Sequence, residues 1–262
     1  MDLGLKERAC IVTGASGGIG AATASALAAE GASLLLVGRR EGALKEVAGV
    51  CGNDAATLAL DLTYPEAADR VVEVCQSRFG RVDVLVNGAG TTALKSLDEL
   101  TESDWQAQWE LHVMAPMRLM RAAAPVMAER GWGRIVNVCS SSGKRPSGTN
   151  MAYSVTKAAQ LSLSRAFADL YASKGVLINA VAPGPIAGAL WLREGGLADQ
   201  MAKARRATRE EVLRSVADRT PLGRLGTEAE VAAVIVFLCS EHASNVAGAA
   251  WSVDGGTVPV II

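Results

Sequence analysis

Short aliphatic runs alternate with longer amphipathic stretches along most of this chain, and this rhythm restricts its possible folds more than any other feature. Runs such as 34–37 and 84–86 are apolar at every position, as expected of strands that helices cover on both faces. Strands in alternation with helices are typical of right-handed βαβ crossovers and of a parallel sheet. The seven predicted strands span 9–12, 33–37, 56–60, 82–86, 134–139, 176–181 and 249–253.

The amphipathic stretches predict the helices, and the length of 262 residues suits one α/β domain with a large sheet. The pattern loosens only over 184–217, which we interpret as a substrate-loop region. We therefore expect residues 1–262 to form one Rossmann-type, doubly wound α/β domain, with helices on both faces of a seven-stranded parallel sheet. The predicted helices span 18–30, 41–50, 65–79, 101–130, 152–174, 198–217 and 227–239.

Charge and hydropathy exclude several classes of protein. The chain has 26 basic and 27 acidic residues, which leaves no broad basic surface for nucleic acid. The N-terminus has no secretory pattern, and the longest apolar run, 231–239, is too short to cross a bilayer. We expect a cytoplasmic protein that binds neither nucleic acid nor membrane.

The cysteines indicate a reducing compartment. They are five in number, form no CxxC pair and lie mostly in runs predicted to be buried. Since the chain has only two histidines, we expect packing cysteines and no metal site. The cysteines are Cys10, Cys51, Cys75, Cys139 and Cys239.

A glycine-rich turn at 13–20 follows the first predicted strand and leads into an alanine-rich helix. In this context glycines permit a tight turn and let the backbone approach a pyrophosphate, which the N-terminus of the helix attracts. The turn therefore predicts a dinucleotide site. The candidate residues are Gly14, Ser16, Gly17, Gly18, Ile19 and Gly20.

The residues after the second strand indicate which dinucleotide binds. An acidic residue at this point binds the ribose 2′-hydroxyl of NAD, whereas arginine accommodates the 2′-phosphate of NADP. The chain has Arg39 and Arg40 here and no carboxylate at the strand end, so we predict NADP with NAD as the alternative. One arginine could instead be a solvated helix-start residue, and Glu41 could partly offset the pair.

Tyr153 and Lys157 stand four residues apart in a predicted helix and so lie on one face of it. A free tyrosine titrates near ~10, and a nearby ammonium is expected to lower the pKa of the phenol toward neutral pH. Ser140, at the end of the fifth strand, could donate a hydrogen bond to a substrate oxygen that gains charge.

Together these motifs resemble the short-chain dehydrogenase/reductase family over essentially the whole chain, and in particular its 3-oxoacyl-carrier-protein reductases. The resemblance implies hydride transfer between a nicotinamide and a carbonyl or alcohol, with Tyr153 as acid–base, Ser140 polarising the oxygen and Lys157 also holding the ribose. It further implies a homotetramer built on the stretches 101–130 and 152–174. Beyond the glycine turn and the arginines, the implied cofactor-binding residues are Asp61, Leu62, Asn87, Gly88, Ala89, Tyr153, Lys157, Pro183, Gly184 and Ile186.

The sequence departs from the family pattern at three positions. Gly88 replaces an asparagine, and Gly188 replaces a threonine that commonly binds the nicotinamide carboxamide. The catalytic asparagine of the family falls on His112, which is either a packed core histidine or a catalytic one. Pro116 has no N–H, so we predict a kink there and a free carbonyl at residue 112. We hypothesise that this carbonyl, and not the imidazole, holds the water of the family's proton relay.

Substrate and chemistry stay open at this stage. The segment 185–197 is either a mobile apolar lid or an ordinary packed helix, and Lys144 or Arg145 could meet an acidic substrate group. The main hypothesis is an NADP-dependent reductase of a ketone, such as a 3-oxoacyl compound, or a dehydrogenase of a secondary alcohol. The alternatives are an NAD-linked alcohol or sugar dehydrogenase and a dinucleotide-binding sensor without turnover.

Overall fold

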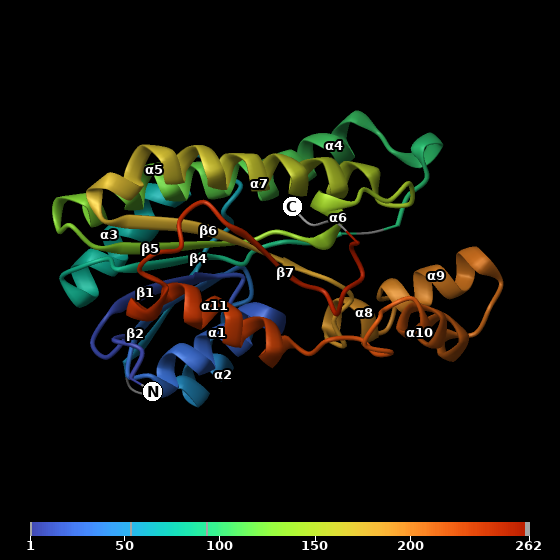
Figure 1. Cartoon of the computed structure of the whole chain (residues 1–262), viewed down its shortest axis with the longest axis horizontal. Coiled ribbons are helices and arrows are strands. Elements are labelled where there is room, and N and C mark those ends of the chain that lie inside the picture. The colour runs from blue at the N-terminus through green and yellow to red at the C-terminus, as the bar shows by residue number, and fades with distance from the viewer. Residues whose placement is uncertain (1, 53, 93, 260–262) are drawn as a thin grey trace.

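The computed structural model describes residues 2–52, 54–92 and 94–259 and contains one seven-stranded parallel sheet (Figure 1). Its strand order, β3-β2-β1-β4-β5-β6-β7, confirms the predicted doubly wound α/β fold. Every predicted strand is present, with ends shifted by no more than two residues. The strands are β1 (Ala9–Thr13), β2 (Ser33–Gly38), β3 (Ala55–Ala59), β4 (Val84–Asn87), β5 (Gly133–Val138), β6 (Val176–Pro183) and β7 (Ala250–Val253).

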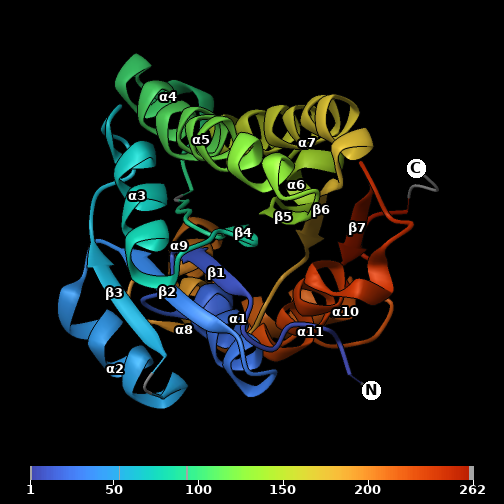
Figure 2. The ribbon, with the colours of Figure 1, turned by 90° about the vertical axis from the view of Figure 1, so that its left-hand side faces the viewer.

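Helices cover both faces of the sheet (Figure 2). One layer contains α1 (Gly18–Ala29), α2 (Glu41–Cys51) and α11 (Glu228–Cys239). The opposite layer contains α3 (Ala67–Phe79), α4 (Glu102–Trp109), α5 (Ala115–Glu129) and α7 (Met151–Tyr171). Shorter turns are the 3₁₀ segments Leu97–Glu99, Ala172–Lys174 and Glu241–Ala243.

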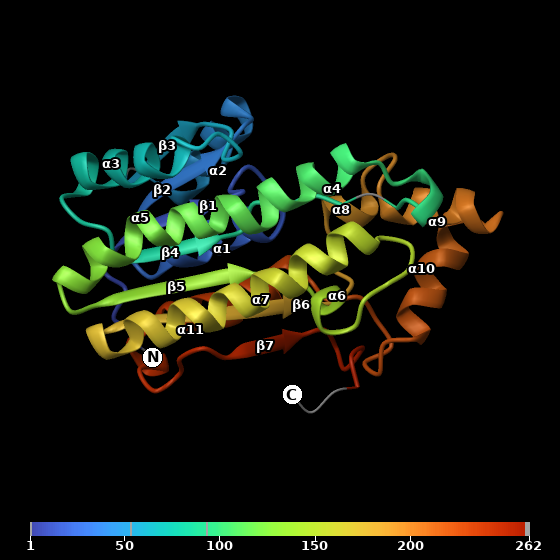
Figure 3. The same cartoon turned by 90° about the horizontal axis from the view of Figure 1, so that it is seen from above.

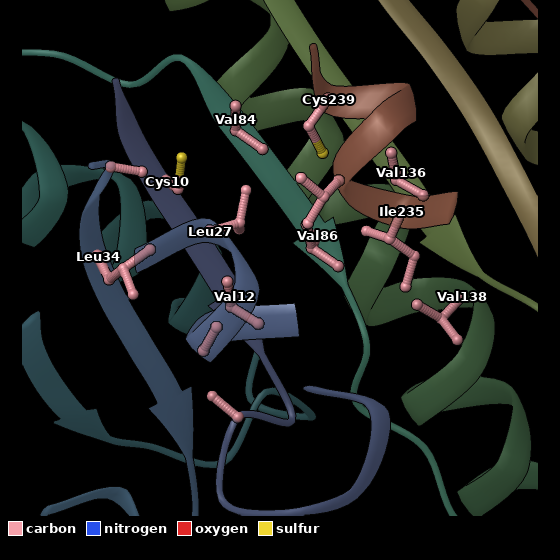
Figure 4. Close-up of a cluster of buried hydrophobic side chains, with 14 of the residues drawn as sticks. Cys10, Val12, Leu27, Leu34, Val84, Val86, Val136, Val138, Ile235 and Cys239 are labelled. Atoms are coloured by element: carbon pink, nitrogen blue, oxygen red, sulfur yellow. The ribbon is translucent and has the colours of Figure 1, made fainter. Parts of the chain in front are cut away.

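The continuously apolar strands divide their side chains between two cores. In β2, Leu34 and Leu36 face the core under α1 and α11, whereas Leu35 and Val37 face the core under α3 and α5. Figure 4 shows the first core, where Ile235 of α11 meets strand residues. Because successive side chains of a strand alternate between faces, a strand buried on both faces must be apolar throughout.

The predicted helix 101–130 contains a wider turn in its middle. Residues Glu110–Met114 form a π-helix, in which the N–H of Ala115 donates to the carbonyl of Glu110. The irregularity that we predicted at Pro116 takes this form, in the turn before the proline. Single π turns inside α-helices are frequent at functional sites.

The single helix predicted over 198–217 is wrong, because the structure has two helices there: α9 (Leu197–Arg205) and α10 (Arg209–Asp218). Arg206 adopts a left-handed conformation that ends α9, and Thr208 caps the N-terminus of α10 together with Glu211. The spacing Thr-x-x-Glu is a capping-box signature, so the sequence contains the signal for this boundary.

The short α8 (Ala189–Leu192) lies with α9 and α10 beyond the carboxyl ends of the strands (Figure 3). The four-residue α6 (Ser141–Lys144) follows β5 at the same edge. Ligands of open α/β sheets bind at this edge, outside the carboxyl ends of the strands. Among the described residues, no helix is both long and apolar enough to cross a membrane.

Candidate active site

Three glycines bring the ends of β1 and β4 and the start of α1 into close contact. Gly14 has a φ of +70°, and a Cβ at this position would lie 2.6 Å from the carbonyl oxygen of Gly88. A Cβ on Gly20 would lie 2.4 Å from the Gly14 carbonyl oxygen, and one on Gly88 would lie 2.7 Å from the Thr13 carbonyl oxygen. Only glycine fits these positions, and the turn leaves the N-terminus of α1 open to a pyrophosphate.

Arg40 folds over this turn. Its Nη2 donates to the carbonyl oxygen of Ser16 at 2.9 Å and to the Ser16 hydroxyl at 3.2 Å. The exposed Arg39 lies near Asp61 and helps to lower the pKa of that carboxyl, although hydrogen bonds from Thr63 are the larger cause. Glu41 pairs with Lys45 at 2.7 Å, so it does not offset the two arginines. A 2′-phosphate therefore fits beside Ser16.

Two further predicted cofactor residues come from the ends of β3 and β4. Asp61 Oδ1 accepts hydrogen bonds from the N–H and hydroxyl of Thr63, and the adjacent Leu62 is buried. Asn87 donates to Asn137 at 2.7 Å, while its buried Oδ1 has no partner within the described residues. An orphaned acceptor at the edge of the glycine turn fits a ribose hydroxyl as its donor.

The side chains of Ser140, which follows β5, and Tyr153 of α7 lie near one another. Ser140 caps α6, where its Oγ accepts the N–H of Ser142 at 3.0 Å, so its own O–H stays available as a donor. Burial raises the pKa of Tyr153 to about 12, and the nearby Ser140 side chain lowers that pKa only in part. The pair can therefore polarise a carbonyl oxygen and hand it a proton.

Lys157 lies on the same face of α7, with its Nζ 5.7 Å from the centre of the Tyr153 ring. The ammonium donates to the carbonyl oxygen of Val138 at 2.8 Å and to Gln160 Oε1 at 2.9 Å. Burial lowers the pKa of Lys157 to about 8. The prediction that the pKa of Tyr153 falls toward neutral pH is wrong for this arrangement, because desolvation opposes the charged form and leaves the pKa raised.

His112 is fully buried in the π turn, edge-on to the Tyr153 ring at 5.3 Å. Its Nε2 accepts the N–H of Thr91 at 3.2 Å, so we assign the proton to Nδ1, which then donates to the Thr156 hydroxyl at 3.1 Å. Burial, with Lys157 nearby, lowers the pKa of His112 to about 2. The imidazole is thus a neutral, packed link between α7 and the loop after β4.

Known proteins match this chain in sequence and in fold. A family model described as Enoyl-(Acyl carrier protein) reductase matches residues 14–258. The 3-oxoacyl-[acyl-carrier-protein] reductase FabG of Escherichia coli (strain K12) is 31% identical, over 97% of this chain and 98% of the relative. The chain belongs to the short-chain dehydrogenase/reductase family. It is therefore an NAD(P)-dependent oxidoreductase that interconverts carbonyl and alcohol groups.

Three other proteins are similar to this chain over nearly the whole length of both chains. The uncharacterized oxidoreductase YvrD of Bacillus subtilis (strain 168) is 34% identical, over 98% of this chain and 99% of the relative. The L-sorbose reductase of Gluconobacter frateurii, solved with NADPH and L-sorbose, superposes with a TM-score of 0.93 at 36% identity and full coverage of both chains. Levodione reductase superposes with a TM-score of 0.90 at 27% identity, over 97% of this chain and 99% of that one.

This short-chain dehydrogenase/reductase replaces the usual threonine at Gly188 with an acidic group from another element. A Cβ on Gly188 would lie 2.1 Å from Oε1 of Glu228, the first residue of α11. The same Oε1 would lie 3.7 Å from a Cβ on Gly18, at the start of α1. The Glu228 carboxylate has no hydrogen bond or ion pair among the residues that the structure describes. No motif in the sequence points to this contact.

The cofactor loop after β6 is held by backbone pairing. Pro183 ends the strand, Gly184 and Ile186 follow it, and Gly184 donates to the Val253 carbonyl at 3.1 Å. Gly226 donates to the Pro185 carbonyl at 3.0 Å, next to Ile186. These bonds place Ile186 at the carboxyl edge of the sheet, as the family pattern implies.

The proposed substrate segment is helical and tied down. Gln200 of α9 accepts the N–H of Leu94 at 2.9 Å, and Arg209 of α10 pairs with Asp199 at 3.1 Å. Within 185–197 the structure has the four-residue α8, none of whose residues is buried, so the choice between a mobile lid and a packed helix stays a prediction. Lys144 donates to the Ala250 carbonyl and the Ser252 hydroxyl of β7, so Arg145 is the better candidate for an acidic substrate group.

Proposed function

We propose that this enzyme uses NADPH to reduce a ketone to a secondary alcohol. The observation that carries the proposal is the grouping of Ser140 and Tyr153 with the buried ammonium of Lys157, which lies close to Gly90 in the loop after β4. The alcohol oxidation is the same path reversed. An NAD-linked alcohol or sugar dehydrogenase and a dinucleotide sensor without turnover are the alternatives.

The cofactor is held by the glycine turn, with the pyrophosphate at the N-terminus of α1 and the 2′-phosphate beside Ser16, Arg39 and Arg40. Asp61 and Leu62 would hold the adenine, while Asn87, Lys157 and Ile186 would hold the nicotinamide half. When bound, NADPH supplies the hydride that the carbonyl carbon receives. The absence of a carboxylate at the end of β2 supports NADPH over NADH.

The protein's own groups act on the carbonyl oxygen. The Ser140 hydroxyl donates a hydrogen bond to this oxygen as it gains charge. Tyr153 transfers its proton to the same oxygen, and a phenol whose pKa lies well above neutral holds that proton until the oxygen becomes more basic. The Lys157 ammonium stabilises the phenolate that remains.

The substrate class follows from related enzymes. L-sorbose reductase and levodione reductase are named for a ketose and a diketone, and FabG for a 3-oxoacyl thioester. All three names denote reduction of a ketone in a partly polar molecule. A panel of ketoses, cyclic diketones and 3-oxoacyl thioesters, with NADPH oxidation as the readout, tests the proposal.

The panel distinguishes the alternatives. Turnover with NADPH that exceeds turnover with NADH at equal concentrations supports the proposal, and the reverse preference supports the NAD-linked dehydrogenase. Tight NADPH binding without turnover on any carbonyl, or with NADP on the corresponding alcohols, supports the sensor. Arg39→Asp is the control, because it places a carboxylate where a 2′-hydroxyl would bind.

We also propose a cytoplasmic homotetramer with interfaces on α4, α5 and α7. Partly exposed apolar side chains on this layer, Trp109, Val155 and Leu170, support the assembly. Light scattering on the eluted protein checks it: a mass of four chains is expected, and a monomer would contradict the proposal. Fractionation of the source cells tests the location.

A further inference from the structure

Gln160 is a polar side chain in the core of α7, only 1% exposed and one turn after Lys157. Its Oε1 accepts a hydrogen bond from the Lys157 ammonium at 2.9 Å, and Val138 provides the second acceptor at 2.8 Å. Side chains three residues apart on a helix lie on the same face, so this contact is built into the helix.

The amide of Gln160 is an unfavourable choice for packing alone. Its Nε2 is buried and has no hydrogen-bond partner among the described residues. A buried donor left without a partner costs folding free energy that an apolar side chain of similar length would not. Among the described residues, the hydrogen bond to Lys157 is the one hydrogen bond that the Gln160 side chain makes. We interpret this bond as the reason for a buried amide at this position.

The backbone of Gln160 is fixed to the sheet by a buried polar chain. The Ser164 hydroxyl donates to the Gln160 carbonyl at 2.7 Å and accepts from Asn137 Nδ2 at 2.8 Å. Asn137 in turn accepts from Asn87 Nδ2 at 2.7 Å. This chain ties α7 to β5 and β4, so the amide oxygen has a fixed place relative to the cofactor cradle.

We propose that Gln160 is a positioning residue that holds the Lys157 ammonium in place for the proposed NADPH-dependent reaction, on which this inference rests. An ammonium has three N–H donors, and Val138 and Gln160 engage two of them. The third is left for the reacting side, where a Cβ on Gly90 would lie 3.8 Å from Nζ. Without the Gln160 side-chain amide, the Lys157 ammonium would be free to rotate away from the reacting side.

The charge on Lys157 depends on the same contact. The titratable groups that face it are Tyr153 on its own helix, Cys139 after β5 and His112 in the π turn, and among the described residues no carboxylate bonds to it. Burial lowers its pKa to about 8, and the hydrogen bonds that favour its charged form come from two neutral acceptors, Val138 and Gln160. The charged form, which holds cofactor and phenolate, is present below this pKa and is lost as the pH rises through it.

Two substitutions separate the role of the amide oxygen from packing. Gln160→Met keeps the length of the side chain and removes the acceptor, so kcat with the best ketone of the panel should fall about tenfold. In the pH profiles of kcat and of NADPH affinity, the decline on the alkaline side (the alkaline limb) should move to lower pH. Gln160→Glu places an anion beside the ammonium and should move both limbs to higher pH. Gln76→Met, at an exposed glutamine of α3, controls for the substitution itself.

Opposite shifts of the alkaline limb in the two Gln160 variants support the inference, since a purely structural role would not move them in opposite directions. Wild-type limbs in both variants overturn it. Lys157→Met keeps the two failures apart: if it retains full turnover, the proposed function of the lysine is wrong, whereas loss of turnover with unchanged Gln160 variants refutes only the role of Gln160. NADPH fluorescence provides the binding readout at every pH.

Discussion

At the scale of single residues, the chemistry depends on how burial changes the acidity of neighbouring groups. Tyr153 and Lys157 both shift toward their neutral forms, to pKa values of about 12 and 8. Both groups are buried, and no carboxylate among the described residues bonds to the Lys157 ammonium to offset its desolvation. A neutral phenol suits proton donation, which is the direction needed for ketone reduction.

Removing the Tyr153 hydroxyl tests this role. Tyr153→Phe should lower kcat by a factor of about 10²–10⁴, the usual contribution of a positioned acid–base, and leave the Kd of NADPH within a few-fold. Stopped-flow turnover and NADPH fluorescence measure the two quantities. Tyr64→Phe, at a tyrosine that is 59% exposed, is the matched control. Full activity in Tyr153→Phe would refute the assignment.

His112 should make the protein sensitive to acid. Its pKa falls from 6.5 to about 2 on folding, so the unfolded chain binds the proton first and stability is lost as the pH falls below 6.5. Between pH 7 and pH 5 this loss amounts to about 2 kcal/mol. Urea unfolding of His112→Asn should show a shallower pH dependence by this amount, with the exposed His242→Asn as control.

The same variant tests the relay hypothesis. If the main chain at residue 112 holds the relay water, His112→Asn should keep kcat within a few-fold of the wild type. A loss of orders of magnitude would make the imidazole itself the functional group. The structure shows why the outcome is informative: the ring already has partners in Thr91 and Thr156, so its role as a packed link is separate from any role of its carbonyl.

At the scale of elements, the cofactor cleft is shaped by the approach of α11 to the glycine turn. Glu228 occupies the space beside Gly188, where most of the family has a side chain. Its carboxylate lies next to the N-terminus of α1, which is the region that must accept a pyrophosphate. The negative charges of the Glu228 carboxylate and of a pyrophosphate bound there would repel one another, and salt would screen this repulsion.

We predict that Glu228→Gln tightens NADPH binding by about 3- to 10-fold at low salt, with a smaller gain at high salt. Gly188→Thr should act in the same direction, since the new side chain displaces the flexible end of Glu228. Calorimetric titration measures both, with the exposed Glu46→Gln as control. Weaker binding in Glu228→Gln would mean that the carboxylate holds the cofactor.

At the scale of the whole molecule, the residues proposed to hold the cofactor come from both halves of the sheet. The glycine turn and the arginines belong to the first half, and Lys157 and Ile186 belong to the second. A ligand that binds only the folded chain raises its stability, by about 2.7 kcal/mol at one hundred times its Kd. Binding should therefore be visible as a shift in melting temperature.

We predict that NADPH raises Tm by several degrees and that NADH at the same concentration raises it less. Arg39→Asp should reduce the shift caused by NADPH and spare that caused by NADH, because it removes a cation from the 2′-phosphate site. Differential scanning fluorimetry provides the measurement. Equal shifts with the two cofactors in the wild type would contradict the assignment of the arginines.

Local sequence determined the strands, most helices and the glycine turn, because periodic burial and glycine geometry act over a few residues. The break at Arg206 was missed, although the capping box at Thr208 marks it. The motif residues could likewise be found from their spacing. The sequence could not indicate the contact of Gln160 with Lys157, since a glutamine in a helix is ordinarily exposed.

Only the tertiary structure decided the protonation of the site and the contact between Glu228 and Gly188. Both depend on side chains that distant parts of the chain pack around a group. Desolvation raises the pKa of Tyr153, whereas its spacing from Lys157 indicated a lowered pKa. Glu228 of α11 fills the space beside Gly188, in the loop after β6. The order of residues along the chain specifies which groups are present, whereas their solvation is a property of the assembled core.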